Sequence, residues 1–175
     1  MNIKSNRLID LLTKRIIGRR AATLTEKLIN QSHNEILIEV DEQNRELGPV
    51  SKYHAHTAEF IKAGRLHRAF SLFVFDHKNQ LLLQKRSKHK VTFASLWTNS
   101  CCSHPLYNDE ERIVEAYKGV RKAAQRRLNY ELNIKHGNLE DFKCIDAHTY
   151  SAMDIVNPNW GEFECKFKRR SHNSA

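Results

Sequence analysis

The sequence has few residues that interrupt regular structure, and it has no long apolar run. Its 175 residues include only three prolines and six glycines, and they contain no internal repeat and no low-complexity segment. The longest apolar candidate, residues 69–75, has the length of a strand, whereas a helix that crosses a bilayer needs about 20 apolar residues. The sequence therefore argues against an integral membrane protein. A hydrophobic fraction of 40% argues against a disordered chain, and 175 residues is the length of one domain.

The central part of the chain lacks net charge, although the whole chain carries +9. Residues 1–27 hold seven basic and two acidic side chains, and residues 166–175 hold four basic side chains and no acid. Residues 28–165 balance 18 basic against 18 acidic side chains. A nucleic-acid-binding domain needs its basic surface on the folded body, so this class is not favoured. This class would be favoured again if the chain bound nucleic acid and lost that binding when both tails were deleted.

Disulfide bonds are not expected. The sequence shows no signal peptide, and two of the four cysteines, Cys101 and Cys102, are adjacent, which suits a disulfide framework poorly. We expect reduced thiols in an intracellular protein.

The N-terminal segment is basic and amphipathic. Apolar residues recur there at near-helical intervals among arginines and lysines, at Leu8, Leu11, Leu12, Ile16 and Ile17. Such a segment resembles a mitochondrial presequence, and it equally fits an ordinary surface helix or a frayed basic extension. We expect an extension over residues 1–30 and one domain over residues 31–175.

The remaining patterns predict several strands and one long helix, which is typical of an α+β fold. A strand is expected at 36–40, followed by a turn at 41–44. A hairpin is expected from a strand at 68–75, a turn at 76–79 and a partner strand at 80–84, a helix at 109–132, and further strands at 142–152 and 162–167. No helix follows the last strand to cover the sheet, so we expect an incomplete domain.

Imidazole and carboxylate groups form one candidate metal set. The chain has ten histidines, and two glutamates lie two residues apart, so that on a strand they would share one face. The candidate ligands are His56, His67, His104, Glu162 and Glu164. A mixed nitrogen and oxygen set suits Zn, Mn or Mg. Taken singly, each histidine also fits an ordinary surface position.

A thiol stands near one of these histidines, in the run Cys101-Cys102-Ser103-His104. A cysteine near an imidazole or a metal can act as a nucleophile or an acid–base group, and the alternative is a small buried side chain.

Basic residues in the flanking segments would suit a diphosphate, and the alternative is solvated surface charge. These are Lys52, Arg86, Lys90 and Arg127.

Five runs together resemble type I isopentenyl-diphosphate isomerase, a member of the Nudix superfamily. The resemblance extends from about residue 36 to residue 164, and the third and fifth runs are specific to that family. The runs are Leu66-His-Arg-Ala-Phe-Ser71, Leu81-Leu-Leu-Gln-Lys-Arg86, Trp97-Thr-Asn-Ser-Cys-Cys-Ser-His-Pro-Leu106, Arg121-Lys-Ala-Ala-Gln-Arg-Arg-Leu128 and Trp160-Gly-Glu-Phe-Glu164. The implied fold is a Nudix-type α/β/α sandwich with a mixed sheet.

The resemblance implies conversion of isopentenyl diphosphate to dimethylallyl diphosphate by protonation and deprotonation on opposite faces of the alkene. It implies that Cys102 and Glu164 are the catalytic pair and that Tyr150 supports the carboxylate. It implies a divalent metal on His56, His67, His104, Glu162 and Glu164, and a Mg ion that Glu131 shares with the substrate. Lys52, Arg86, Lys90 and Arg127 match diphosphate-binding positions, and Ser103 lies beside the substrate.

Some positions depart from the family. Ala94-Ser95 stands where the family usually has Pro-Gly, and Asn133 replaces the glycine that closes the long helix. Family members also continue well beyond the second glutamate, with further strands, a helix and a tryptophan that faces the carbocation. We therefore expect a domain truncated at its C-terminal end.

Two rival functions stay open at this stage. A Nudix hydrolase needs several helix glutamates to hold metal, and here Glu131 is the one that remains, so hydrolysis is disfavoured. A non-catalytic remnant that binds metal or diphosphate without turnover is the alternative from a different class.

The expected partner is the small-molecule substrate, with no nucleic acid and no membrane span. The expected state is a monomer, cytoplasmic, or mitochondrial if residues 1–27 act as a leader.

Overall fold

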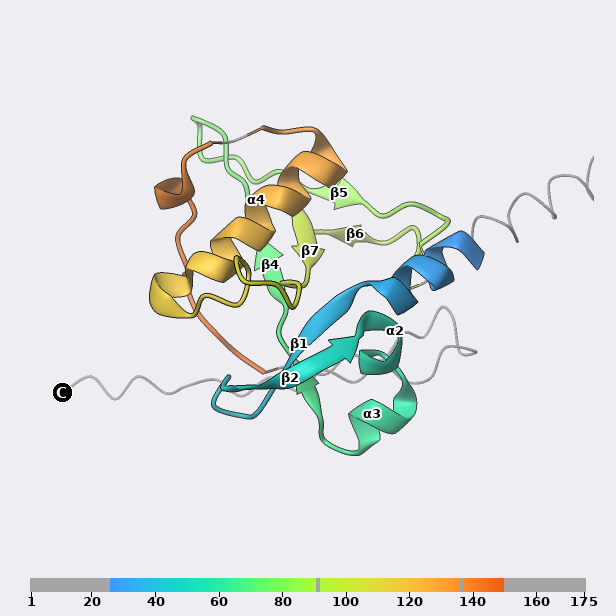
Figure 1. Cartoon of the computed structure of the whole chain (residues 1–175). Helices are drawn as coiled ribbons and strands as arrows, with labels where there is room; N and C mark the ends of the chain where they lie inside the picture. Colours follow the sequence, from blue (N-terminus) through green and yellow to red (C-terminus); the bar gives the residue numbers. More distant parts are fainter. Residues whose placement is uncertain (1–25, 91, 136, 150–175) are drawn as a thin grey trace, which may run out of the picture.

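The computed structural model describes residues 26–90, 92–135 and 137–149, and combines short antiparallel sheets with helices (Figure 1). A helix over residues 26–34 leads into a three-stranded sheet whose order is β2, β1, β3. Its strands are β1 (Ile36–Val40), β2 (Glu46–Ser51) and β3 (Leu66–His67). Two further pairs are β4 (Phe70–Leu72) with β7 (Cys101–Ser103), and β5 (Gln84–Lys85) with β6 (Trp97–Thr98). The coarse α+β prediction is confirmed.

Two short helices lie between β2 and β3, where no helix was predicted. They are α2 (Lys52–Ala55) and α3 (Ala58–Lys62), and each begins at a hydroxyl residue. The Ser51 hydroxyl accepts the His54 backbone N–H at 3.2 Å, and the Thr57 hydroxyl accepts the Phe60 N–H at 3.3 Å. Such caps satisfy backbone donors that a helix start otherwise leaves without partners.

A small core joins these helices to the sheet. Its buried members are Leu37, Val50, Ala55, Phe60 and Ile61, with Leu106 packed against them. Burying side chains of this size contributes roughly 1.5–3 kcal/mol each. The core therefore holds α2 and α3 against β1 and β2.

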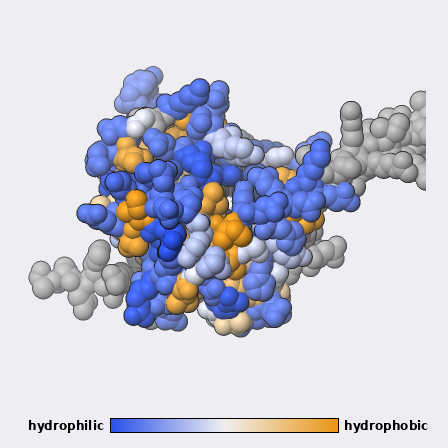
Figure 2. Space-filling model, in the orientation of Figure 1, coloured by the Kyte–Doolittle hydropathy of each residue, from blue (hydrophilic) through white to orange (hydrophobic). Residues whose placement is uncertain are grey.

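The long helix α4 (Lys118–Leu132) packs against β4 and β7 (Figure 1). Ala123, Ala124 and Leu128 are buried on its inner face, together with Arg127. Figure 2, in the same orientation, shows mostly hydrophilic side chains over the outer surface of this part of the molecule. The helix therefore covers one side of the β4–β7 pair.

The predicted start of this helix is wrong by nine residues. Residues 115–117 form a 3-10 turn (η1, Glu115–Tyr117), in which Ala116 and Tyr117 have left-handed backbone, with φ of 46° and 57°. At Gly119 a Cβ atom would lie 2.2 Å from the Glu111 carbonyl oxygen, so that the chain can turn this closely only without a side chain. Apolar residues at helical intervals continued through this turn and misled the prediction.

The predicted turn at 76–79 is confirmed, but the partner strand predicted at 80–84 is not regular, because Leu81 forms an isolated bridge and Gln84 belongs to β5, which pairs with β6. The Asp76 N–H bonds the Gln80 carbonyl at 3.1 Å, and Phe75 bridges Leu81 in antiparallel register. The regular strand β4 is shorter than predicted and pairs with β7.

The strand predicted at 142–152 is wrong for its described part. A 3-10 turn, η2 (Leu139–Asp141), precedes it, and residues 142–149 form no strand. Residues 150–152 and the strand predicted at 162–167 lie outside the described residues.

Several large apolar side chains stay exposed on the hairpin and the neighbouring β6. Phe75 is 54% exposed, Leu83 52% and Trp97 68%. The strand on which the prediction of an uncovered sheet rests lies outside the described residues, so it stays a prediction. None of the helices in the described ranges is long and apolar enough to cross a membrane.

The loop before β6 places a serine in left-handed backbone. Ser95 has φ of 63°, at a position where glycine was expected. Left-handed backbone costs an L-residue roughly 1–2 kcal/mol, whereas glycine loses about 0.4–1 kcal/mol more chain entropy on folding. We predict that Ser95→Gly raises the free energy of unfolding by about 0.5–1 kcal/mol in urea titrations.

Asn133 is the matched control, because it ends α4 with φ of 54° and asparagine tolerates this conformation. Asn133→Gly should change stability by less than Ser95→Gly. A destabilised Ser95→Gly chain would contradict the assignment of strain to this serine.

Candidate active site

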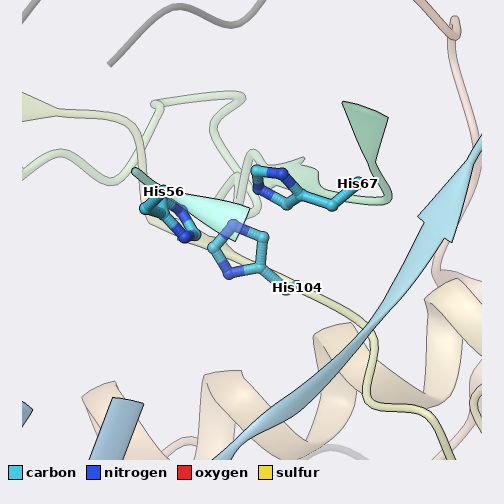
Figure 3. Close-up of side chains that lie close together, drawn as sticks. All are labelled: His56, His67 and His104. Atoms are coloured by element: carbon cyan, nitrogen blue, oxygen red, sulfur yellow. The ribbon is translucent and has the colours of Figure 1, made fainter. Parts of the chain in front are cut away.

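Three histidines from separate segments converge on one point (Figure 3). His56 ends α2, His67 lies in β3, and His104 follows β7. One ring nitrogen from each lies within 4.8 Å of the others. The ring centroids are 4.6, 4.9 and 5.0 Å apart. The structure thus brings together three of the five residues in the predicted metal set.

Strand β1 accounts for this convergence. It pairs with β3 so that Glu39 faces His67, and the Lys52 N–H at the start of α2 bonds the Glu35 carbonyl just before β1 at 2.8 Å. On the far side of His104, Leu106 bridges Leu37, and the Tyr107 N–H bonds the Ile36 carbonyl at 2.8 Å. Each histidine therefore lies within a few residues of a backbone contact to β1 or to the residue before it.

The three imidazoles are held in their neutral form. Burial lowers the pKa of His56 to about 4, and burial together with His56 lowers the pKa of His67 to about 3. Burial, with a further contribution from the other two rings, lowers the pKa of His104 well below its ordinary value. Neutral imidazole is the form that binds a metal.

The ring nitrogens also fit a metal. His56 Nδ1 lies 2.7 Å from the Lys52 carbonyl oxygen, which can only accept, so Nδ1 donates and the lone pair of the ring is on Nε2, the nitrogen that can bind a metal. His67 Nε2 is buried and has no hydrogen-bond partner among the described residues. A buried polar atom without a partner costs about 1–3 kcal/mol, and a metal would remove this cost. Three imidazoles suit Zn best among the common divalent metals and also suit other transition metals.

The remaining predicted members of this site, Glu162, Glu164 and Tyr150, lie outside the described residues. Their roles stay predictions.

An ion pair supports the turn that carries His104, and the sequence analysis missed it. Arg126 Nε donates to Glu111 at 2.6 Å, and Arg126 Nη2 donates to the His104 carbonyl at 3.2 Å. Glu111, which is 5% exposed, also accepts the Leu106 N–H at 2.8 Å. These residues looked like solvated charges of an amphipathic helix, so no sequence signal marked them.

The two adjacent cysteines point to opposite sides of β7, as alternation along a strand requires. Cys101 is fully buried toward α4, where its thiol donates to Glu131 at 3.5 Å. Burial and the nearby Glu131 carboxylate raise the pKa of Cys101 to about 12, which makes it an inert thiol. Cys102 lies on the other side and is partly exposed, with its sulfur 2.8 Å from Asn99 Oδ1 and 3.5 Å from Ser71 Oγ. The structure thus separates a reactive candidate from a structural neighbour.

Ser103 follows Cys102 and pairs with Phe70 across the two strands. Alternation puts it on the same side of β7 as Cys101. The substrate contact predicted for Ser103 stays a prediction.

Glu131 lies at the centre of a second polar cluster. It accepts from Arg127, from Lys90 Nζ at 3.5 Å and from Gln84 Nε2 at 3.4 Å. Burial by itself would raise the pKa of Glu131, but Lys90 and Arg127 outweigh it and hold that pKa below its ordinary value. Glu131 is therefore an ionised carboxylate, as a metal ligand must be. The structure thus brings together three of the predicted residues: Lys90, Arg127 and Glu131.

The two other predicted diphosphate contacts already have protein partners. Lys52 Nζ donates to Glu35 at 2.6 Å, and the Arg86 guanidinium donates to the carbonyl groups of Thr92 and Phe93. Lys52 starts the same helical turn that ends at His56, so it belongs to the histidine side of the site. A diphosphate would have to compete for both cations.

Comparison with known proteins identifies the relatives of this chain. No family model matches it. It is 42% identical to the isopentenyl-diphosphate delta-isomerase of Gibberella zeae, over 77% of this chain and 54% of the relative. It is 47% identical to the chloroplastic isopentenyl-diphosphate Delta-isomerase I of Arabidopsis thaliana, over 73% and 44%. It is 45% identical to the isopentenyl-diphosphate delta-isomerase of Schizosaccharomyces pombe, over 76% and 59%.

All three relatives are named as enzymes of one class, the isomerases. More narrowly, the chain is a homologue of isopentenyl-diphosphate isomerases, which confirms the resemblance seen in the sequence. The chain spans about half the length of the curated relatives it matches.

The depressed histidine pKa values predict how the metal-free chain responds to acid. The unfolded chain takes up protons below the ordinary histidine pKa of 6.5, while the folded chain keeps its imidazoles neutral down to about pH 4. The contribution of the neutral imidazoles to the free energy of unfolding is therefore fully present above pH 6.5. It falls as the pH drops, by about 1.4 kcal/mol per pH unit for each imidazole. Urea unfolding of chelator-treated protein between pH 7.5 and 5 measures this slope.

The variant His67→Leu is the control, because it removes one of the three imidazoles and the buried nitrogen that lacks a partner. It should reduce the slope by about one third and abolish stabilisation by added Zn. A slope equal to that of the unchanged chain would contradict the burial assigned to His67.

Proposed function

We propose that this chain is a metal-dependent isomerase that interconverts isopentenyl diphosphate and dimethylallyl diphosphate, on a Nudix-type α/β/α fold. The observation that carries the proposal is the convergence of His56, His67 and His104, the last of which follows the partly exposed Cys102 by two residues in the sequence. Relatives at 42–47% identity that are named isopentenyl-diphosphate isomerases support it. The chain spans about half of each relative, so the activity of the whole enzyme is part of the proposal.

The reaction requires two groups that exchange protons with carbon. A proton adds to the terminal alkene carbon, a tertiary carbocation forms, and a proton leaves from the carbon on the other side of the cation. One proton is gained and one is lost, so the substrate and product are isomers. We assign the two exchanges to Cys102 and Glu164, and we assign Tyr150 to orient Glu164. Positioned groups of this kind contribute roughly 10²–10⁴-fold to a rate.

The metal ligands of the proposal are His56, His67 and His104, completed by Glu162 and Glu164. A bound divalent ion, Zn, Mn or Mg, would fix the orientation of Glu164 and lower its affinity for a proton. The chain's own contribution is to keep three imidazoles neutral and aimed at one point.

The proposed diphosphate site uses the second cluster. Arg127 and Lys90 supply positive charge next to the ionised Glu131, which we assign to a Mg ion shared with the substrate. Lys52, Arg86 and Ser103 complete the proposed set. A diphosphate needs donors from several elements, and these come from α2, the segment after β5, β7 and α4.

The rest of the proposal concerns partners and location. We propose a small-molecule substrate as the partner, with no nucleic acid, a monomeric state and a cytoplasmic location. A mitochondrial address encoded in residues 1–27 is the alternative. The Arabidopsis relative is described as chloroplastic, a description that applies to that protein.

The proposed acid–base role of Cys102 predicts loss of turnover in Cys102→Ala. Proton NMR of isopentenyl diphosphate in D₂O, with Zn and Mg supplied, should show deuterated dimethylallyl diphosphate for the unchanged chain. The rate should fall at least about 100-fold in the variant, because the neighbouring Cys101 faces the opposite side of β7 and cannot replace the lost group, while metal content stays the same. Cys144→Ala is the matched control, since Cys144 is exposed and remote in sequence from β7, and it should keep the full rate.

Other outcomes of this assay decide between the candidates. Release of inorganic phosphate or pyrophosphate would favour a Nudix hydrolase. An unchanged substrate signal with normal metal content would favour the non-catalytic remnant. Turnover by Cys102→Ala near the original rate would remove Cys102 from the mechanism.

The dual role proposed for Glu164 predicts a different result from that for Cys102. Glu164→Gln should lower both turnover and metal content, because the amide is a poorer ligand and cannot take up and release a proton as a carboxyl group does. Metal analysis after gel filtration and the NMR assay measure the two effects. Glu140→Gln is the control, since Glu140 is an exposed residue paired with Arg121, and normal values for both variants would refute the dual role.

A further inference from the structure

Asn99 makes several side-chain hydrogen bonds, although no function has so far been assigned to it. It lies between β6 and β7, three residues before Cys102, within the run that is specific to the family. Its amide nitrogen donates to the Leu72 carbonyl at 2.8 Å and to the Cys101 carbonyl at 3.0 Å. One side chain therefore ties both strands of the β4–β7 pair.

These two contacts determine which way the amide points. Both partners of Nδ2 are carbonyl oxygens, which can only accept, so the NH₂ group must face them. A rotated amide would turn Oδ1 toward two acceptors and lose both bonds. The oxygen is thereby fixed on the side of Cys102.

The fixed oxygen accepts from the Cys102 thiol. The distance from Cys102 Sγ to Oδ1 is 2.8 Å, whereas Ser71 Oγ and Thr98 Oγ1 lie 3.5 and 3.9 Å from the same sulfur. The Thr98 hydroxyl also donates to Oδ1, at 2.9 Å. Among the described residues, Oδ1 thus has two donors, and the Asn99 amide is the polar group nearest to the sulfur.

We propose that Asn99 is the positioning residue of Cys102. It fixes the side-chain rotamer of the cysteine, and so the place of the sulfur, by linking the S–H group to two strand carbonyls. Holding a reacting group before substrate arrives reduces the entropy that the transition state must lose. The inference rests on the proposed function in one respect, that Cys102 exchanges a proton with the substrate.

The kinetic test compares two neighbouring substitutions that each remove two links to backbone. Asn99→Ala loses its bonds to Leu72 and Cys101 together with the thiol contact. Ser100→Ala loses a bond from the Val74 N–H at 2.8 Å and one to the Leu82 carbonyl at 2.6 Å, and it has no contact with the Cys102 thiol. Both variants should be less stable. Asn99→Ala alone should show a kcat lowered by about 10-fold or more, with KM within about threefold of the original, because the loss falls on the chemical step.

A spectroscopic test reads the thiol directly and needs no turnover. The S–H stretching band of Cys102, assigned by subtracting the infrared spectrum of Cys102→Ser, should lie at lower frequency than that of a model thiol in water. Asn99→Ala should move it to higher frequency, and Ser100→Ala should leave it in place. The unchanged chain supplies the first of these readings even if Asn99→Ala does not fold.

Each outcome decides the inference. The inference would be overturned if the Cys102 band of the unchanged chain lay at the frequency of the model thiol in water. An unmoved band in folded Asn99→Ala, or equal kcat losses in Asn99→Ala and Ser100→Ala, would also overturn it. If the unchanged chain shows no isomerisation, the proposed function fails separately. The band then decides by itself whether Asn99 positions the thiol.

Discussion

The two-sided pairing of β1 is the constraint on which the rest of the structure depends. One edge pairs with β2 and the other with β3, and residues 106–107 contact its first residues. Leu37 and Ile38 within it are fully buried. Metal ligands need placement to a few tenths of an ångström, and a short central strand gives three distant segments one common reference.

Hydrogen bonds from side chains to the backbone help to hold the other strands in place, because these strands are short. Three strands of the described chain, β3, β5 and β6, are two residues long, so ladder hydrogen bonds alone hold them weakly. Arg68, Arg86, Asn99 and Ser100 each donate to backbone carbonyls of another segment. Buried carbonyl groups need such partners, and here the same bonds position the loops around the site.

The sequence allowed prediction of elements whose signal is local. The apolar run 36–40 and the turn residues 76–79 predicted β1 and the turn of the hairpin correctly, because side-chain alternation and turn chemistry act over a few residues. The helix start at Lys118 was missed because apolar spacing continues through residues that turn with left-handed backbone. Helices α2 and α3 are too short to show a period.

The site could be predicted in part for the same reason. Cys102 and His104 stood out because they lie two residues apart in one motif, and the structure shows that His104 meets His56 and His67. The partners that position them were not visible in the sequence. Glu111 and Arg126 looked like surface charge, and the role of Asn99 depends on two carbonyl groups that no residue type reveals. The buried His67 nitrogen has a consequence for the protein in the cell. A metal bound there would give this nitrogen a partner and would add its binding free energy to folding, so the amount of folded chain that escapes proteolysis would then follow the metal supply.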